Sequence, residues 1–216
     1  MIQIKKGREP KEWETIRQTP GIDYDTADKT ALRSALLSEQ GAICGYCMRR
    51  IDYVPGTTTD TRIEHVKPRS LSISEGKPEE TLSYGNMILC CNGDVDGDND
   101  EHCDRSKAER AIHFSPFDTV AMETITYSWR DGIIKSTNQQ IDADLNQVLN
   151  LNHKRLAANR YAVIKGLLAE MKKGNWKRAG VEAKLVEYGS KDASGHYKEY
   201  CGVVIWFLNK RLRQFA

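Results

Sequence analysis

The pattern of hydrophobic and polar positions near the start of the chain has the period of an α-helix. Residues 10–19 begin with Pro10, whose fixed φ angle suits the first turn of a helix. Residues 28–41 carry leucines along one face and end on Gly41, a residue type that often follows the last turn. The pattern therefore predicts two helices in the N-terminal part.

The last third of the chain shows the same helical period over longer segments. Residues 152–174 have a broad apolar face, and residues 197–215 contain the longest apolar run, which predicts a largely buried helix. Residues 124–137, which precede them, read as a β-hairpin that turns at Asp131 and Gly132. We therefore expect a hairpin followed by a mostly helical C-terminal region.

The middle of the chain mixes strand-like and helix-like segments. Residues 61–68 alternate as a strand does, and residues 86–91 are apolar and predicted to be buried. The polar residues 69–85 between them form a surface loop or a short helix, and residues 103–112 read as a helix with Asp104 near its start. The whole pattern predicts an α+β protein.

The composition of the chain limits the class of protein and the cellular compartment that we can expect. The 216 residues carry a formal net charge of +2, which is too small to indicate a nucleic-acid-binding protein by itself. No apolar run approaches the roughly 20 residues that cross a bilayer, and the first residues lack the apolar segment of a secretion signal. We therefore expect a cytoplasmic protein, in which clustered cysteines indicate a metal site and not disulfides.

The cysteines have the spacing of a structural zinc site. Cys44 and Cys47 form a Cys-x-x-Cys turn, and a second group lies far along the chain, with either Cys90 or Cys91 followed by Cys103. Zinc prefers a closed tetrahedral set of thiolates, and such a turn supplies two of them at the right separation. The sequence predicts one zinc ion held by four of these residues.

An acidic segment separates the last two predicted zinc ligands. Aspartate occupies every second position of residues 94–100, as in the opening of an EF-hand calcium loop. That loop needs a glycine at its sixth position and a glutamate at its twelfth, where this chain has Asn99 and Arg105. We interpret the segment as an acidic insert and not as a calcium site.

Polar residues around the cysteines follow an order that identifies a family. Glu64 and His65 end a predicted strand, Asn86 follows some twenty residues later, and Asp104 precedes Lys107 by one helical turn. This order resembles the HNH, or ββα-metal, endonucleases, with "EHVKP" in the place of their first motif. The resemblance covers roughly residues 41–112, and the spacing from the asparagine favours Cys91 over Cys90 as a zinc ligand.

The chemistry of these residue types suits phosphodiester hydrolysis. A neutral His65 can serve as general base, and Asn86 can orient it. The carboxylates of Glu64 and Asp104 are hard oxygen ligands for Mg²⁺ or Mn²⁺. The predicted contacts to nucleic acid are Lys67, Arg69, Arg105 and Lys107, with His102 as an additional metal or phosphate contact.

The flanking segments narrow the resemblance. They are similar to the HNH subunit of Septu-type and retron-associated anti-phage systems, the PtuB family. The resemblance implies a zinc-supported ββα-metal core at residues 41–112, an N-terminal helical extension at 1–40, and a hairpin and helical region at 113–216. It also implies a toxic nuclease that works with an ABC-type ATPase subunit (PtuA-like), or within a retron reverse transcriptase complex.

Three functional alternatives stay open at this stage. DNA is the favoured substrate, and tRNA is the alternative in a retron-type complex. A non-catalytic zinc module that docks on the ATPase would need the cysteines but not Glu64, His65 and Asp104. The helical tail is either a stabilising cap on the core or a docking surface for the ATPase, and in the second case the basic pairs Lys177–Arg178 and Lys210–Arg211 are the predicted contacts.

Overall fold

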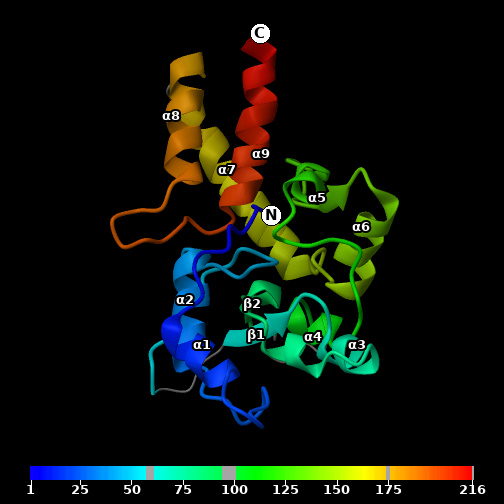
Figure 1. Ribbon diagram of the computed structural model, residues 1–216. Helices are drawn as coiled ribbons and strands as arrows, with labels where there is room; N and C mark the ends of the chain where they lie inside the picture. Colours follow the sequence, from blue (N-terminus) through cyan, green and yellow to red (C-terminus); the bar gives the residue numbers. More distant parts are fainter. Residues whose placement is uncertain (57–60, 94–100, 174–175, 216) are drawn as a thin grey trace.

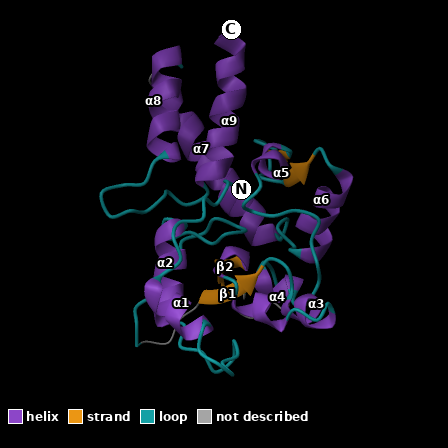
Figure 2. Ribbon diagram, in the orientation of Figure 1, coloured by secondary structure: helices purple, strands orange, loops and turns teal. Residues whose placement is uncertain are grey.

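The computed structural model describes residues 1–56, 61–93, 101–173 and 176–215. Within these ranges the chain is α+β, with two small antiparallel sheets set among helices (Figure 2). This confirms the fold class predicted from the hydrophobic pattern. The predicted acidic insert, residues 94–100, lies outside the described residues.

The two helices predicted at the start of the chain are present. Helix α1 spans Lys11–Arg17 directly after Pro10, and helix α2 spans Thr30–Glu39. Gly41 has a φ angle of 59°, a left-handed conformation that glycine adopts without a steric penalty. The indole of Trp13 is fully buried, so α1 is anchored to the core by one large side chain.

The first sheet is formed by the predicted strand of residues 61–68 and by the segment predicted to be apolar and buried, which is also a strand. Strand β1 (Thr61–His65) pairs antiparallel with strand β2 (Met87–Cys91), and Glu64 lies opposite Ile88. All five residues of β2 are buried, which explains its continuous apolar sequence. The connection between the strands contains the short helix α3 (Arg69–Ser74) and two 3₁₀ turns, Pro78–Leu82 and Tyr84–Asn86.

Helix α4 begins where the sequence predicts but is much shorter. It spans only Asp104–Lys107, whereas the pattern predicted a helix over residues 103–112. Ala108 has a φ angle of 49°, which ends the helix after one turn. The guanidinium group of Arg110 then folds back and donates to the carbonyl oxygens of Ser106 and Val148. The contact between Arg110 and Val148, which no local pattern encodes, therefore stands where a second turn of α4 was predicted.

A second small sheet follows, as the sequence predicts. Strand β3 (Ile125–Tyr127) pairs antiparallel with strand β4 (Ile134–Ser136), and Gly132 turns between them with a φ angle of 74°. The flanking elements are α5 (Thr119–Glu123), α6 (Gln139–Ala143) and a π-helical turn at Asp144–Val148.

Three helices form the C-terminal part and gather on one side of the molecule (Figure 1). They are α7 (Lys154–Lys173), α8 (Arg178–Gly189) and α9 (Cys201–Leu212), and α8 and α9 pack closely along each other. The apolar face predicted for α7 is largely correct, but Tyr161 is 39 % exposed. Arg160 is buried in its place because its guanidinium group bonds to carbonyl oxygens of the neighbouring hairpin and loop.

A single large cluster of buried hydrophobic residues draws on all three segments of the predicted domain division. Its members come from the N-terminal helices, both small sheets, α7 and α9, including Leu36, Leu89, Ile134, Ile164 and Val203. A smaller cluster joins α7, α8 and α9. Among the described residues, the helices are all too short or too polar to cross a membrane.

Candidate metal centre and cleft

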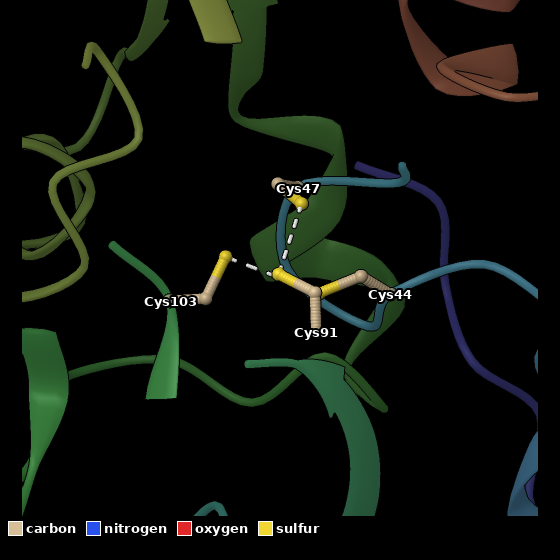
Figure 3. A group of neighbouring side chains, drawn as sticks. All are labelled: Cys44, Cys47, Cys91 and Cys103. Atoms are coloured by element: carbon tan, nitrogen blue, oxygen red, sulfur yellow. Dashed lines mark hydrogen bonds between the residues drawn. The ribbon is translucent and has the colours of Figure 1, made fainter. Parts of the chain in front are cut away.

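Four of the predicted zinc ligands come together from three separate parts of the chain (Figure 3). The sulfur atoms of Cys44, Cys47, Cys91 and Cys103 lie within 4.8 Å of one another, and all four residues are buried. Two of the separations are 3.8 Å, from Cys47 to Cys91, and 3.9 Å, from Cys44 to Cys103. A tetrahedral zinc ion with bonds of about 2.3 Å requires sulfur atoms about 3.8 Å apart. The cluster therefore has the size and chemistry of a structural metal site.

The strand geometry of β2 separates the two candidate cysteines. Successive side chains of a strand point to opposite faces, so Cys90 and Cys91 approach the cluster from different sides of β2, and the Cys90 thiol hydrogen-bonds with Cys44. Cys91 belongs to the four-cysteine group, whereas Cys90 is buried outside it. The choice of Cys91 in the sequence analysis agrees with this arrangement.

The Cys-x-x-Cys turn is fixed against β2 by backbone and side-chain hydrogen bonds. The amide of Gly45 donates to the carbonyl oxygen of Leu89 at 3.0 Å. The buried side chain of Gln40 donates to Ile43 and Leu89 and accepts from the amide of Leu89 at 2.7 Å. The positions of the first two cysteines are thus set by the end of α2 and by the central strand.

The thiols influence one another's ionisation. Hydrogen bonding from Cys103 lowers the pKa of the Cys91 thiol to about 7. Burial opposes ionisation of Cys44, but hydrogen bonds from the surrounding thiols lower its pKa well below the ordinary value. The Nδ1 atom of His102 lies 3.2 Å from the sulfur of Cys103. Burial raises the pKa of Cys47 and of Cys103 well above the ordinary value, so only Cys44 and Cys91 are shifted toward the thiolate, the form that binds zinc.

A polar cleft of about 630 Å³ lies beside the first sheet and contains the predicted catalytic residues. Glu64, His65 and Asp104 all line it. Each is 9 % exposed or less, so the three groups open onto the cleft from a largely buried position. The cationic side chains that line the same cleft are Lys29, Arg33, Arg62, Arg69 and Arg105.

Glu64 is held through one of its two oxygen atoms. Its Oε1 accepts a hydrogen bond from the Tyr46 hydroxyl at 2.9 Å and lies 2.8 Å from the ammonium group of Lys107. Burial raises the pKa of Glu64 to about 8, and the neighbouring Asp104 carboxyl adds to this shift while Lys107 opposes it. Asp104 in turn forms an ion pair with Arg62. Each of the two carboxyl groups therefore has one cationic partner, and the pKa of Glu64 is raised because burial outweighs the effect of Lys107.

His65 has the environment of a neutral imidazole with a defined tautomer. Its Nε2 lies 2.8 Å from the carbonyl oxygen of Thr81, which can only accept a hydrogen bond, so Nε2 carries the proton and Nδ1 is left as the acceptor. The ring of Tyr24 packs edge-on against it, with centroids 4.6 Å apart. Burial lowers the pKa of His65 to about 4. The imidazole is therefore neutral at pH 7, with Nδ1 free of a proton.

Two of the predicted site residues, Asn86 and Lys107, form hydrogen bonds to backbone groups and not to the space that a substrate would occupy. The side-chain amide of Asn86 bonds to both backbone groups of Lys67, at 2.8 and 2.9 Å, which fixes the chain directly after β1. Lys107 is fully buried and donates to the carbonyl oxygen of His65 at 3.1 Å. Lys107 therefore does not reach the surface at which the sequence analysis placed a phosphate contact, because the buried Glu64 carboxyl holds its ammonium group inside.

The remaining predicted contacts are divided between the cleft and other surfaces. Arg69 and Arg105 line the cleft, where they pair with Asp25 and Glu101. Lys67 instead pairs with two glutamates outside it, and buried His102 lies beside the cysteine cluster.

Several cleft residues were not predicted from the sequence. Arg62 could have been found, because alternation along β1 places it on the same side as Glu64. Tyr24, Lys29 and Arg33 come from the N-terminal part, and no spacing in the sequence links them to His65. Tyr46 lies inside the Cys-x-x-Cys turn, where a zinc motif alone gives it no function.

No family model and no curated protein matches this chain.

Proposed function

We propose that this protein is a metal-dependent endonuclease of the HNH type. The observation that carries the proposal is the convergence of Glu64, His65 and Asp104 on one polar cleft lined by five cationic side chains. An antiparallel strand pair followed by a short helix, beside four clustered cysteines, is also the arrangement expected of a zinc-supported ββα-metal core. Residues 61–107 supply all three of these polar groups.

The donor set suits a divalent cation. Two carboxyl groups, Glu64 and Asp104, lie together at low exposure, and the pKa of Glu64 is raised because its burial outweighs the nearby ammonium group of Lys107. Hard carboxylate oxygens select Mg²⁺ or Mn²⁺. When bound, such a cation would supply charge stabilisation for the phosphate and for the departing oxygen.

The protein's own residues then provide positioning and proton transfer. The Nδ1 atom of His65 accepts a proton from the attacking water, and the Thr81 carbonyl holds the ring in the required tautomer. Arg62, Arg69 and Arg105 at the cleft bind phosphates on either side of the reacting one. Asn86 keeps the segment after β1 in place through its two backbone hydrogen bonds.

DNA is the substrate class that we favour, with tRNA as the second arm of the test. In the proposed setting the nuclease is an anti-phage effector that associates with a PtuA-like ABC-type ATPase, through Lys177–Arg178 at the start of α8 and Lys210–Arg211 at the end of α9. A retron reverse transcriptase complex is the alternative assembly.

The decisive experiment compares wild-type protein with His65→Ala on plasmid DNA and on tRNA. Each reaction contains Mg²⁺ or Mn²⁺, with and without the ATPase. We expect cleavage by the wild type and a loss of about 100-fold or more in the variant, because a general base contributes about 10²–10⁴ in rate. His196→Ala, a histidine outside the cleft, is the matched control.

Equal cleavage by wild type and by folded, zinc-loaded His65→Ala would contradict the mechanism. No cleavage by the zinc-loaded wild type with its ATPase present would contradict the nuclease and leave the zinc docking module as the explanation of the cysteines.

A further inference from the structure

Tyr46 lies between the two cysteines of the Cys-x-x-Cys turn and reaches the candidate active site. The residue is completely buried, and its hydroxyl group donates to Oε1 of Glu64 at 2.9 Å. A phenol hydroxyl carries its proton at neutral pH, so it can donate this hydrogen bond. This side chain therefore joins the four-cysteine cluster to the cleft through one hydrogen bond.

The turn that carries Tyr46 is held from two sides. On one side, Cys44 and Cys47 belong to the cysteine cluster. On the other, the Gly45 amide bonds to Leu89 of β2, one residue from Ile88, which lies opposite Glu64 in the sheet. A β-carbon on Gly45 would lie 2.8 Å from the side chain of Ile88, so the turn approaches the strand at a distance that favours glycine.

The geometry explains how Glu64 keeps one orientation. A glutamate side chain has three rotatable bonds, and both strong contacts here are made to the same oxygen, by Tyr46 and by Lys107. The second oxygen, Oε2, would then serve as the ligand atom toward a cation that Asp104, which is within hydrogen-bonding reach of Glu64, would share. Hydrogen bonds to the back of a ligand carboxylate are known to determine metal affinity.

We propose that Tyr46 is a positioning residue that couples the four-cysteine centre to the cleft by orienting Glu64 for a divalent cation. The inference rests on the proposed function, because it assigns Glu64 to the catalytic cation. It goes beyond that function because it assigns the Cys-x-x-Cys turn a second role. The turn carries the hydroxyl group that orients Glu64, the proposed ligand of the divalent cation.

The test is the Mn²⁺ affinity of the full-length, zinc-loaded chain, measured from the electron paramagnetic resonance signal of free Mn²⁺. Tyr46→Phe keeps the buried ring and removes only the hydroxyl group. We expect the zinc content to stay the same and the Mn²⁺ affinity to fall about 10-fold or more, as for other groups that support metal ligands.

Tyr84→Phe is the matched control. Tyr84 is also buried, and its hydroxyl also donates to a carboxylate, that of Glu39, which lies outside the cleft. Its substitution removes the same kind of bond and should leave Mn²⁺ affinity unchanged. In a Glu64→Ala background, Tyr46→Phe should have no further effect on Mn²⁺ binding, because the group that it positions is gone.

The outcomes separate the inference from the proposed function. If the wild type binds Mn²⁺ and cleaves nucleic acid, but zinc-loaded Tyr46→Phe binds Mn²⁺ within twofold of it, only the inference is overturned. Loss of zinc from Tyr46→Phe would also overturn it, since the hydroxyl would then support the turn and not the carboxylate. If the wild type binds no Mn²⁺, the proposed function fails and the inference fails with it.

Discussion

At the scale of single residues, burial decides the state of the titratable groups in the cleft. His65 is 6 % exposed, and its pKa is lowered to about 4 by desolvation. Glu64 is 4 % exposed, and its pKa is raised to about 8 for the same reason. Burial disfavours the charged form of both groups, so one becomes an available base and the other a carboxyl group that needs a cation.

The lowered pKa of His65 predicts a pH-dependent stability. The unfolded chain takes up the proton near pH 6.5 and the folded chain only near pH 4, so stability is complete above pH 6.5 and is lost as the pH falls toward 4. Between pH 7 and pH 5 this one group should remove about 2 kcal/mol from the free energy of unfolding. Urea unfolding of the wild type and of His65→Gln at both pH values measures the effect.

Glutamine can still donate to the Thr81 carbonyl but does not titrate. The wild type should therefore lose about 2 kcal/mol more than His65→Gln over this interval. Equal losses in the two proteins would show that His65 has an ordinary pKa in the fold.

At the scale of elements, the alternation of one strand assigns the zinc ligand. The sequence left two adjacent cysteines, and in β2 only Cys91 lies close to all three of the other cluster sulfur atoms, while Cys90 contacts Cys44. The same strand pairs with β1, which carries Glu64 and His65 into the cleft. Helix α4 begins just after the fourth cysteine and brings Asp104 and Lys107 to the same place.

This arrangement predicts opposite outcomes for two neighbouring substitutions. Cys91→Ser should reduce the zinc content from about one ion per chain and make the protein protease-sensitive, because a structural zinc ion contributes directly to folding. Cys90→Ser removes an equally buried thiol outside the cluster and should retain zinc. Elemental analysis and limited proteolysis of the two variants decide the matter, and the reverse pattern would assign the site to Cys90.

At the scale of the whole molecule, a buried arginine joins the C-terminal helices to the rest. Arg160 on α7 is 1 % exposed, and its guanidinium group donates to the carbonyl oxygens of Gly132 at 2.6 Å and Leu151 at 2.8 Å. A β-carbon on Gly132 would lie 2.1 Å from the carbonyl oxygen of Ala157, so the hairpin turn packs directly on the helix. The long helix and the small second sheet are thus held by specific polar contacts as well as by the apolar core.

Replacing Arg160 by methionine should lower the free energy of unfolding by about 3 kcal/mol. The change leaves two buried carbonyl groups without a donor, and each unsatisfied buried group costs about 1–3 kcal/mol. Lys165→Met, an exposed position on the same helix, is the control and should change stability by less than about 0.5 kcal/mol. Urea unfolding compares the two, and a similar small effect in both would contradict a structural role for Arg160.

The sequence by itself determined those features that depend on local order. Local patterns gave α1, α2, α7, α9, strand β1 and the β3–β4 hairpin, and the spacing of the cysteines gave the four-cysteine site. Only the tertiary structure decided the rest. It ended α4 after one turn through the long-range contacts of Arg110, turned Lys107 inward to Glu64, and brought Tyr24 against His65 and Tyr46 against Glu64. These contacts join residues 18–43 positions apart, and such distances are fixed by how elements pack and not by the pattern along any one of them.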